Sequence, residues 1–416
     1  MCSTYEEGEI LEPPREVPRV QKVCMKCKKN SPQLVIRVND AFCRDCFLQH
    51  CTHKFRSAFG KSKIIRDGER VLIAFSGGPA SSALLHLVME GKSVRAQKKL
   101  RFLPGILYID EGAALGSSRS CQQDDLEFIK EKLTISQYPY HIVKLEQLCD
   151  EIVGDRTPTE RLNQLFHAAE TATAKEQLLC TLRREIMIQV AKAEGYSKVI
   201  VADTSSRLSI AFLSNMAMGK GAHISYDTSL LDDRDSSVYI MRPLKDFTDK
   251  EVAMYNRFNG ITAVTRLSFT TKAVAGSSIN KLTEAFITGL QDQFPSTVST
   301  IMRTSEKLMN SKQATDGDGE TTCIEACSVC KAPLDTRVPK SSALMSVSHA
   351  DMLCERRLQE RGSESGSICR SPHPVSSLCY SCRGMLADMS NTEFLPSCLT
   401  STNRMAMRSA IEDSLL

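Results

Sequence analysis

Eight of the seventeen cysteines form four pairs in which two residues separate the two thiols. Because such a pair directs two sulfur atoms at one ion, two pairs together supply the four thiolates of a tetrahedral zinc site. Cysteine-rich chains of reducing compartments use such pairs to bind metal more often than to form disulfides. The spacing predicts two zinc ions, one bound by Cys24, Cys27, Cys43 and Cys46 and the other by Cys327, Cys330, Cys379 and Cys382.

Neighbouring side chains offer alternative ligands for both predicted zinc sites. The first two pairs are 15 residues apart, which is typical of a zinc ribbon, whereas 48 residues separate the last two. A long intervening loop is compatible with zinc binding because the entropy of loop closure grows only logarithmically with length. The alternatives are His50, Cys51 and His53 for the first site, and Cys323, Cys354 and Cys369 for the second.

A second chemistry-bearing stretch, SGGPASS, occupies residues 76–82 between an apolar strand pattern and an apolar helix pattern. Gly77 and Gly78 allow close backbone approach to a phosphate, and Ser76, Ser81 and Ser82 offer hydroxyl groups. The N–H groups at the start of the following helix add a partial positive charge. The lysine of a Walker loop and the GxGxxG pattern are both absent, so these two nucleotide-binding classes are excluded. The pattern predicts a phosphate-binding turn.

This loop resembles the PP-loop of the ATP pyrophosphatases, enzymes that adenylate a substrate and release pyrophosphate. YIDEGAA at 108–114 and RPLKDFTDKEVAMYN at 242–256 are similar to the tRNA-thiolating branch of that superfamily. With FPSTVSTIMRTSEKL at 294–308 and the terminal cysteine pairs, the chain resembles the cytoplasmic tRNA 2-thiolation protein 2 family. The resemblance covers residues 20–385.

The resemblance implies a location and a set of partners. It implies that the chain acts in the cytoplasm and forms a heterodimer with a catalytic PP-loop sister subunit. It also implies a ubiquitin-like carrier that supplies sulfur as a thiocarboxylate. The sulfur replaces the 2-oxygen of the wobble uridine in Lys, Glu and Gln tRNAs, as in mcm5s2U. ATP and Mg²⁺ act in the complex, because adenylation turns a poor oxygen leaving group into AMP.

Two departures from the active members remove acidic residues. Active PP-loops read SGGxDS, but Ala80 stands at the acidic position, and Ser206 and Arg207 stand where active members carry two carboxylates. The loop residues and Asp110 are therefore expected to form a degenerate ATP or phosphate site. Asp110 and Glu111 could contact a metal or ribose, although acidic residues that end a strand often only cap the following turn.

A third departure concerns the nucleophilic cysteine. Active members place it a few residues before an Arg-Arg pair, whereas here Cys180 lies one residue nearer to Arg183 and Arg184, and Leu179 takes the aligned position. The three departures together predict a structural, tRNA-binding subunit without catalytic residues of its own. The alternatives are an active adenylating sulfurtransferase that uses Cys180, and a zinc-ribbon adaptor that binds only proteins.

Positive charge is concentrated near the start of the chain. Residues 19–66 contain twelve Lys or Arg and two Asp, a net charge of +10, whereas the whole chain carries +4. Such a block indicates a surface for a polyanion. We expect tRNA phosphates to be contacted by Lys22, Lys26, Lys28, Lys29, Lys54, Arg56, Lys61 and Lys63. No secretory signal or membrane-spanning apolar run is apparent, so no membrane association is expected.

Alternating strand and helix patterns must position these residues. Strands are expected at 71–75, 103–109, 140–145, 198–202 and 238–241, and helices at 80–92, 122–134, 174–194, 205–217 and 248–258. This alternation predicts an α/β fold with a doubly wound parallel sheet, whose ligands bind at the carboxyl ends of the strands. The expected organisation is a disordered segment (1–18), a zinc ribbon (19–56), the PP-loop α/β domain (57–290), and a helical extension and C-terminal zinc module with a mobile linker (291–416).

Overall fold

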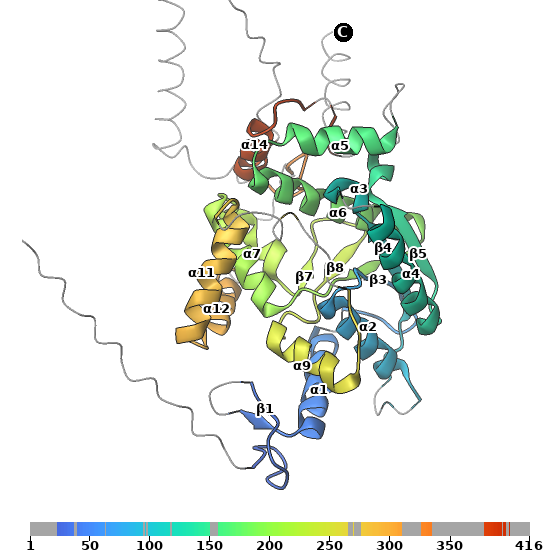
Figure 1. Ribbon diagram of the computed structural model, residues 1–416, viewed down its shortest axis with the longest axis vertical. Helices are drawn as coiled ribbons and strands as arrows, with labels where there is room; N and C mark the ends of the chain where they lie inside the picture. The colour runs from blue at the N-terminus through green and yellow to red at the C-terminus, as the bar shows by residue number, and fades with distance from the viewer. Residues whose placement is uncertain are drawn as a thin grey trace, which may run out of the picture.

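A six-stranded sheet lies at the centre of the molecule in the computed structural model (Figure 1). Five strands run parallel, and their order is β5-β4-β3-β6-β8, with the antiparallel β7 at the edge next to β8. The bounds are β3 Arg70–Ala74, β4 Leu103–Asp110, β5 Tyr140–Lys144, β6 Lys198–Ile200, β7 Leu231–Asp232 and β8 Tyr239–Met241. The predicted α/β fold is confirmed, with β7 as an addition that makes the sheet mixed.

The structure describes residues 23–36, 40–62, 64–94, 96, 99–116, 119–149, 157–264, 269, 276–309, 326–334, 378–392, 394–396 and 399. The segment 1–18 and almost all of the expected linker lie outside these residues, as do the alternative ligands Cys323, Cys354 and Cys369. Within the described residues, no helix is long and apolar enough to cross a membrane.

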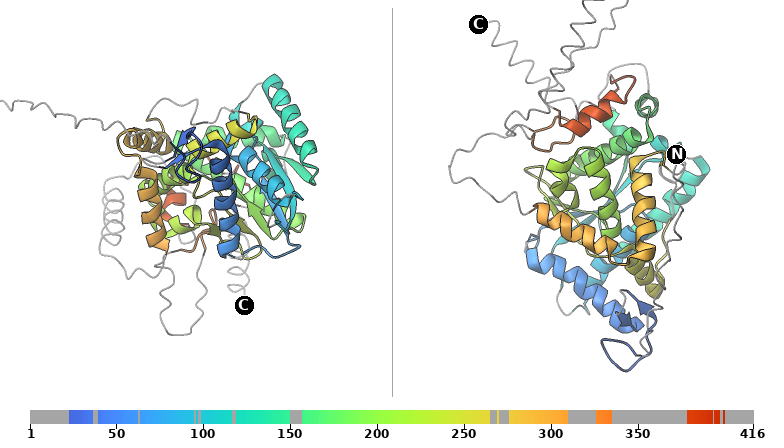
Figure 2. Two further views of the ribbon diagram at one scale, coloured as in Figure 1. Left: turned by 90° about the horizontal axis from the view of Figure 1, so that it is seen from below. Right: turned by 90° about the vertical axis from the view of Figure 1, so that its left-hand side faces the viewer.

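Helices cover both faces of the sheet (Figures 1 and 2). Because successive strand residues point to opposite faces, Val71 and Ile73 pack against α1, α2, α4 and α9, while Leu72 packs toward α6 on the other face. The helices are α1 Arg44–Ser62, α2 Pro79–Lys92, α3 Gly112–Leu115, α4 Arg119–Ser136, α5 Pro158–Ala168, α6 Ala172–Ala193, α7 Ser205–Ala217, α8 Ile224–Thr228, α9 Asp249–Asn259, α11 Ile279–Gln293, α12 Thr297–Met309 and α14 Tyr380–Ala387. Short 3₁₀ turns occupy Leu145–Cys149 and Gly221–His223.

The N-terminal cysteine module is continuous with the α/β domain. Its hairpin, β1 (Leu34–Val35) and β2 (Ala41–Phe42), leads into α1, and Phe47 and Phe55 of α1 lie in the same apolar core as Val71 of the sheet. Lys54 Nζ also lies 2.7 Å from Glu251 Oε1 on α9. The boundary expected at residue 56 therefore falls inside a helix, and this structure shows no break there.

The C-terminal segments pack at two separate places. α11 and α12 cover α7, where Leu208, Ile287 and Met302 share a small apolar cluster. The cysteine module formed by 326–334 and α14 lies instead against α5 and α6 (Figure 2), where Gln177 Nε2 donates to Ser381 Oγ at 3.0 Å. The chain thus brings its last described segment back to the carboxyl end of the sheet.

Candidate functional site

The strand order places the candidate nucleotide site between β3 and β6. From β3 the chain adds β4 and β5 on one side, and it later adds β6 and β8 on the other side. At such a reversal the loops that follow the two central strands separate and leave a crevice for ligands. The loop 75–79 follows β3 and the segment 201–204 follows β6, so both lie at the carboxyl ends of neighbouring strands.

In the phosphate loop the three serine hydroxyls bond to the loop itself. Ser76 Oγ lies 3.1 Å from Ser81 Oγ, which donates to the carbonyl oxygen of Gly78 at 3.0 Å. Ser82 Oγ donates to the carbonyl oxygen of Gly77 at 3.4 Å. The predicted residues are thus brought together, but their hydroxyls hold the turn in shape.

Neighbouring segments also cover the loop. Gly77 has a φ of +78°, and a Cβ there would overlap Ile129 Cδ1, so α4 packs directly on the glycine backbone. Val264 N donates to the carbonyl oxygen of Gly77 at 2.9 Å. Ala80 packs against the main apolar core at the position where an active PP-loop has its acid. The backbone of Gly77 is therefore packed against neighbouring segments, while Ser76 is exposed.

The acidic residues at this edge of the sheet are held by protein groups. Glu111 forms a bidentate ion pair with Arg183, and Asp203 Oδ2 lies 3.1 Å from Nε of Arg242. Asp110 Oδ1 accepts a hydrogen bond at 3.0 Å from the N–H of Gly112, the first residue of α3. Ser206 Oγ likewise accepts from Asp249 N, at 3.3 Å.

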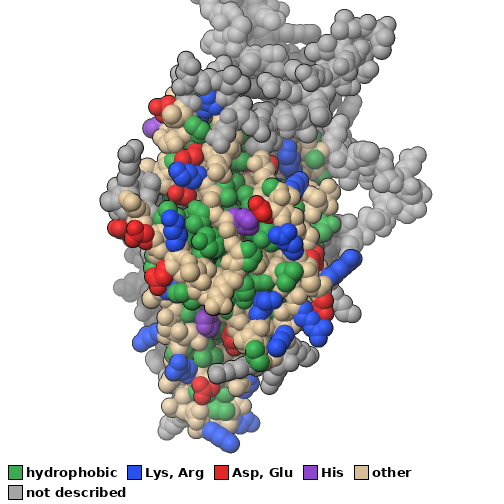
Figure 3. Space-filling model, turned by 90° about the vertical axis from the view of Figure 1, so that its right-hand side faces the viewer, with side chains coloured by type: hydrophobic (Ala, Val, Ile, Leu, Met, Phe, Trp, Pro, Cys, Tyr) green, Lys and Arg blue, Asp and Glu red, His purple; other side chains and the backbone are tan. Residues whose placement is uncertain are grey.

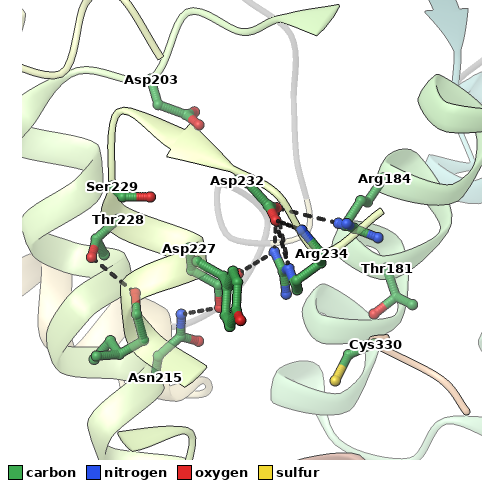
Figure 4. Close-up of polar contacts among 12 residues, drawn as sticks. Thr181, Arg184, Asp203, Asn215, Asp227, Thr228, Ser229, Asp232, Arg234 and Cys330 are labelled. Carbon is green, nitrogen blue, oxygen red and sulfur yellow. Dashed lines mark hydrogen bonds and ion pairs between the residues drawn. The ribbon is translucent and has the colours of Figure 1, made fainter. Parts of the chain in front are cut away.

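A buried ionic network that the sequence reasoning missed lies beside this edge (Figure 4). Arg234 Nη2 lies 2.6 Å from both Asp227 Oδ1 and Asp232 Oδ2, and Arg184 Nε lies 3.4 Å from Asp232. Burial alone would raise the pKa of Asp232, but Arg234 and Arg184 bring it well below its ordinary value. The network is therefore two carboxylates balanced by two guanidinium groups. In the sequence, part of this network is the run Asp232-Asp233-Arg234. Such a charged run is usually found on a solvated surface, so it gives no sign of a buried network.

The four N-terminal cysteines lie together as predicted, with all four sulfur atoms within 4.8 Å of one another. In the first pair, Lys28 has a φ of +54° and its N–H donates to the carbonyl oxygen of Cys24 at 2.8 Å, which closes a tight knuckle. The second pair differs from a ribbon, because Cys46 lies in the first turn of α1 and Cys43 directly precedes it.

The alternative N-terminal ligands do not belong to this four-sulfur group. His50 stacks on Phe42 with ring centroids 5.3 Å apart, and His53 is exposed. Cys51 is fully buried in the apolar core, and burial raises the pKa of its thiol to about 12. His50 and Cys51 therefore take part in packing, and His53 lies at the surface.

The C-terminal group repeats this construction. Its four sulfur atoms also lie within 4.8 Å of one another. Lys331 has a φ of +59° and donates its N–H to the carbonyl oxygen of Cys327 at 2.9 Å, while Cys379 is the N-cap of α14 and Cys382 lies inside that helix. Each end of the chain thus combines one knuckle with the first turn of one helix.

The sulfur separations fit a single tetrahedral ion. Zinc–sulfur bonds of about 2.3 Å place neighbouring sulfurs about 3.8 Å apart in a tetrahedron. The separations are 3.9 Å for Cys27–Cys43 and 3.7 Å for Cys330–Cys379. Cysteine sulfur atoms that bind an iron–sulfur cubane lie farther apart than this, because the iron and sulfide atoms of the cluster lie between them. The pKa values of the free thiols differ within the group. Burial opposes ionisation of Cys24, but backbone N–H groups lower its pKa to about 6, whereas burial and the neighbouring thiols raise the pKa of Cys46 to about 12.

The predicted tRNA-contacting residues are only partly available for phosphate. Lys28 and Lys29 are exposed, and Lys26 Nζ donates to Gln49 at 3.2 Å on the surface. Lys54 instead bonds to Glu251, and Arg56 is half-buried. Lysine and arginine side chains are visible at the tip formed by this module (Figure 3). Lys22, Lys63 and the side chain of Lys61 lie outside the described residues.

Comparison with known proteins assigns the family. The sequence profile described as "Cytoplasmic tRNA 2-thiolation protein 2" matches residues 278–384. Cytoplasmic tRNA 2-thiolation protein 2-A of Xenopus laevis is 37% identical, over 100% of this chain and 99% of that protein. The chain belongs to the cytoplasmic tRNA 2-thiolation protein 2 family. The Homo sapiens member is 35% identical, over 95% of this chain and 93% of its own.

The fold is shared with a solved thiolase. The U34-tRNA thiolase NcsA from Methanococcus maripaludis, solved with its [4Fe-4S] cluster, superposes with a TM-score of 0.55 and 16% identity, and the match covers 76% of this chain and 93% of that one. This similarity establishes the PP-loop fold for this member of the tRNA 2-thiolation protein 2 family. The cluster belongs to NcsA, and the sulfur spacing above fits a single ion here.

Proposed function

We propose that this chain is the structural, tRNA-binding subunit of the cytoplasmic complex that 2-thiolates the wobble uridine of Lys, Glu and Gln tRNAs. A sister PP-loop subunit adenylates the uridine with ATP and Mg²⁺, and a thiocarboxylated ubiquitin-like protein supplies the sulfur. Family membership supports the role in thiolation. The two four-cysteine groups hold zinc in this proposal and stabilise the modules that they belong to.

One observation supports the division of labour between the subunits. A triphosphate and its Mg²⁺ need free backbone or hydroxyl donors and free carboxylates. In the described residues at this edge, Ser81 and Ser82 bond to the loop itself, and Glu111 and Asp203 bond to arginine. Magnesium could bind Glu111 or Asp203 only if these ion pairs broke, which leaves Asp110 as the carboxylate at this edge without an arginine partner among the described residues. We therefore assign the adenylation step to the sister subunit.

Replacing Ser76 and Ser81 together by alanine should reduce thiolation by less than about 3-fold when the change is made in this chain. The same pair of changes in the sister subunit should cost about 100-fold or more, because charge-stabilising groups at reacting phosphates have effects of that size. Thiolated uridine in tRNA is measured after incubation with the reconstituted pair. Equal losses from the two subunits would show that both loops take part.

Charge reversal at Lys28 and Lys29 should weaken tRNA binding at low salt and lower its salt slope by about two units, since each phosphate contact contributes about one. The slope is measured by titrating labelled tRNA at several salt concentrations. Charge reversal at Lys99 and Lys130, which are also exposed but lie outside the basic block, is the matched control. An unchanged slope in the Lys28, Lys29 variant would move the phosphate contacts to another surface.

The alternative of an active sulfurtransferase depends on Cys180. Its thiol is exposed on α6, one turn before Arg183. Cys180→Ser should leave thiolation by the reconstituted pair unchanged if the sister subunit carries the nucleophile. Loss of sulfur transfer with normal tRNA binding would instead establish Cys180 as the sulfur-carrying residue.

A further inference from the structure

The side chain of His223 has no part in the sites described above. It lies in the short 3₁₀ turn Gly221–His223, between α7 and α8 of the α/β domain. The residue is only 7% exposed, and its buried Nδ1 atom has no hydrogen-bond partner of ordinary geometry among the described residues. Because burying an unpaired polar atom costs free energy, a buried imidazole at this place requires an explanation.

The ring of His223 lies beside the C-terminal four-sulfur group. Contacts with the three other thiols of that group, followed by a hydrogen bond with His223, lower the pKa of the Cys379 thiol. The backbone before His223 is packed against the same place, because a Cβ on Gly219 would lie 2.4 Å from Cδ1 of Tyr380, the residue after Cys379. His223 is not a member of the four-sulfur group. It therefore contacts a ligand from outside the set of ligands.

The N-terminal group has a similar contact from a different side chain. Asn30 Nδ2 donates to Cys43 Sγ at 3.9 Å. Cys43 and Cys379 hold equivalent places, since each directly precedes the helix that carries the fourth cysteine of its group. A side-chain N–H beside the same thiol in both groups favours a common role over chance packing. Metal ligands are commonly oriented by such outer hydrogen bonds.

The α/β domain also places positive charge beside the C-terminal group. Burial opposes the charges of Lys220 and Arg234, but Asp227 and thiols that include Cys330 raise the pKa of both side chains. Figure 4 shows Cys330 next to the ionic network to which Arg234 belongs. Four thiolates around one zinc ion carry a net charge of about −2, and a buried charge needs nearby compensation. The domain therefore offers the group both a hydrogen-bond donor and opposite charge.

We infer that His223 is a positioning residue of the C-terminal metal group: its ring donates an N–H to the metal-bound thiolate of Cys379 and so ties the metal to the α/β domain. Asn30, the corresponding donor at the other end of the chain, belongs to the N-terminal cysteine module itself. Zinc at the C-terminal group should therefore hold α14 against the domain. The inference depends on the zinc assignment and goes beyond the proposed role in thiolation.

Zinc removal from the full chain by a chelator tests the inference. His223→Leu keeps an apolar side chain but has no donor, so it should lower the chelator concentration that removes the C-terminal zinc by about 10- to 100-fold. His223→Gln, which keeps an N–H donor, should restore most of the retention. The release step that is missing in Cys327→Ser identifies the C-terminal ion. Asn30→Leu is the matched control, and it should weaken retention of the N-terminal ion alone.

Hydrogen exchange gives a second readout that needs no change at His223. In Cys327→Ser, amides of 221–228 and of α14 should both exchange faster, whereas Cys24→Ser should leave them protected. Normal zinc retention by His223→Leu would overturn the inference. Equal losses in His223→Leu and His223→Gln would also overturn it, because the ring would then only fill space. The same conclusion would follow if the unaltered chain held no zinc at the C-terminal group, or if 221–228 stayed protected in Cys327→Ser.

Discussion

Replacing Cys24 with serine is expected to lower the zinc content from about two ions to about one and to unfold the N-terminal module. The hairpin beside this site has only two residues in each strand, so its own hydrogen bonds cannot hold it. Zinc binding to such a module contributes about 10–16 kcal/mol of apparent free energy, and this becomes folding free energy. The bound metal is measured by elemental analysis, and folding by hydrogen exchange over residues 23–46.

Cys51→Ser is the matched control for this change. Cys51 lies on the same helix and is fully buried, yet it is outside the four-sulfur group. This variant should lose some stability through its buried hydroxyl but keep both zinc ions. The assignment of the site would be contradicted if the Cys24→Ser variant still bound two zinc ions. It would also be contradicted if the unaltered protein, purified without chelator, contained no zinc.

Replacing Arg234 with methionine should destabilise the fold by about 3–5 kcal/mol, because Asp227 and Asp232 would keep their buried charges without their main partner. The unfolding free energy in urea measures the effect at pH 7. Changing both aspartates to asparagine in the same chain should restore most of the loss, since the uncompensated charge then disappears. A loss below about 1 kcal/mol in the single variant would show that the network is solvated.

This network also has a defined pH dependence. In the unaltered chain the folded-state pKa of Asp232 lies below its unfolded value, so its stabilising contribution is present above about pH 4 and is lost as the pH falls through the folded value. The Arg234→Met variant loses the strongest contact that lowers this pKa but keeps Arg184 at 3.4 Å, so the folded-state pKa moves up toward the unfolded value. The variant therefore loses less stability than the unaltered chain as the pH falls below about 4. The difference between the two proteins should narrow over that range.

The sequence predicts the central strands well because each is a short, continuous apolar run, such as 71–75, with a helical pattern after it. It misses β7, whose two residues are too few to show periodicity, and α1, which the cysteine pattern obscures. It also misses α5, although Thr157 and Glu160 form a capping box and Pro158 occupies the first helical position.

For the candidate sites, the sequence predicts which residue types take part, but it does not predict which side chains form ion pairs with one another. Cysteine spacing alone identified both four-sulfur groups. Arg234, one partner of Asp232, is two residues away. Arg183, the partner of Glu111, and Arg184, the other partner of Asp232, come from distant segments, and only the folded chain shows these two ion pairs. The same holds for Lys54, which looks like a phosphate contact in the sequence but binds Glu251, 197 residues away.

Pyrophosphate release tests the central claim most directly, namely that this subunit has no adenylating activity of its own. The purified chain, its sister subunit and the pair are each incubated with ATP, Mg²⁺ and unthiolated lysine tRNA. We predict release by the pair, or by the sister alone, and none above background by this chain. Pyrophosphate release by the isolated chain that Ser76→Ala abolishes would contradict the claim, because it would show that the loop at 76–82 binds and activates ATP.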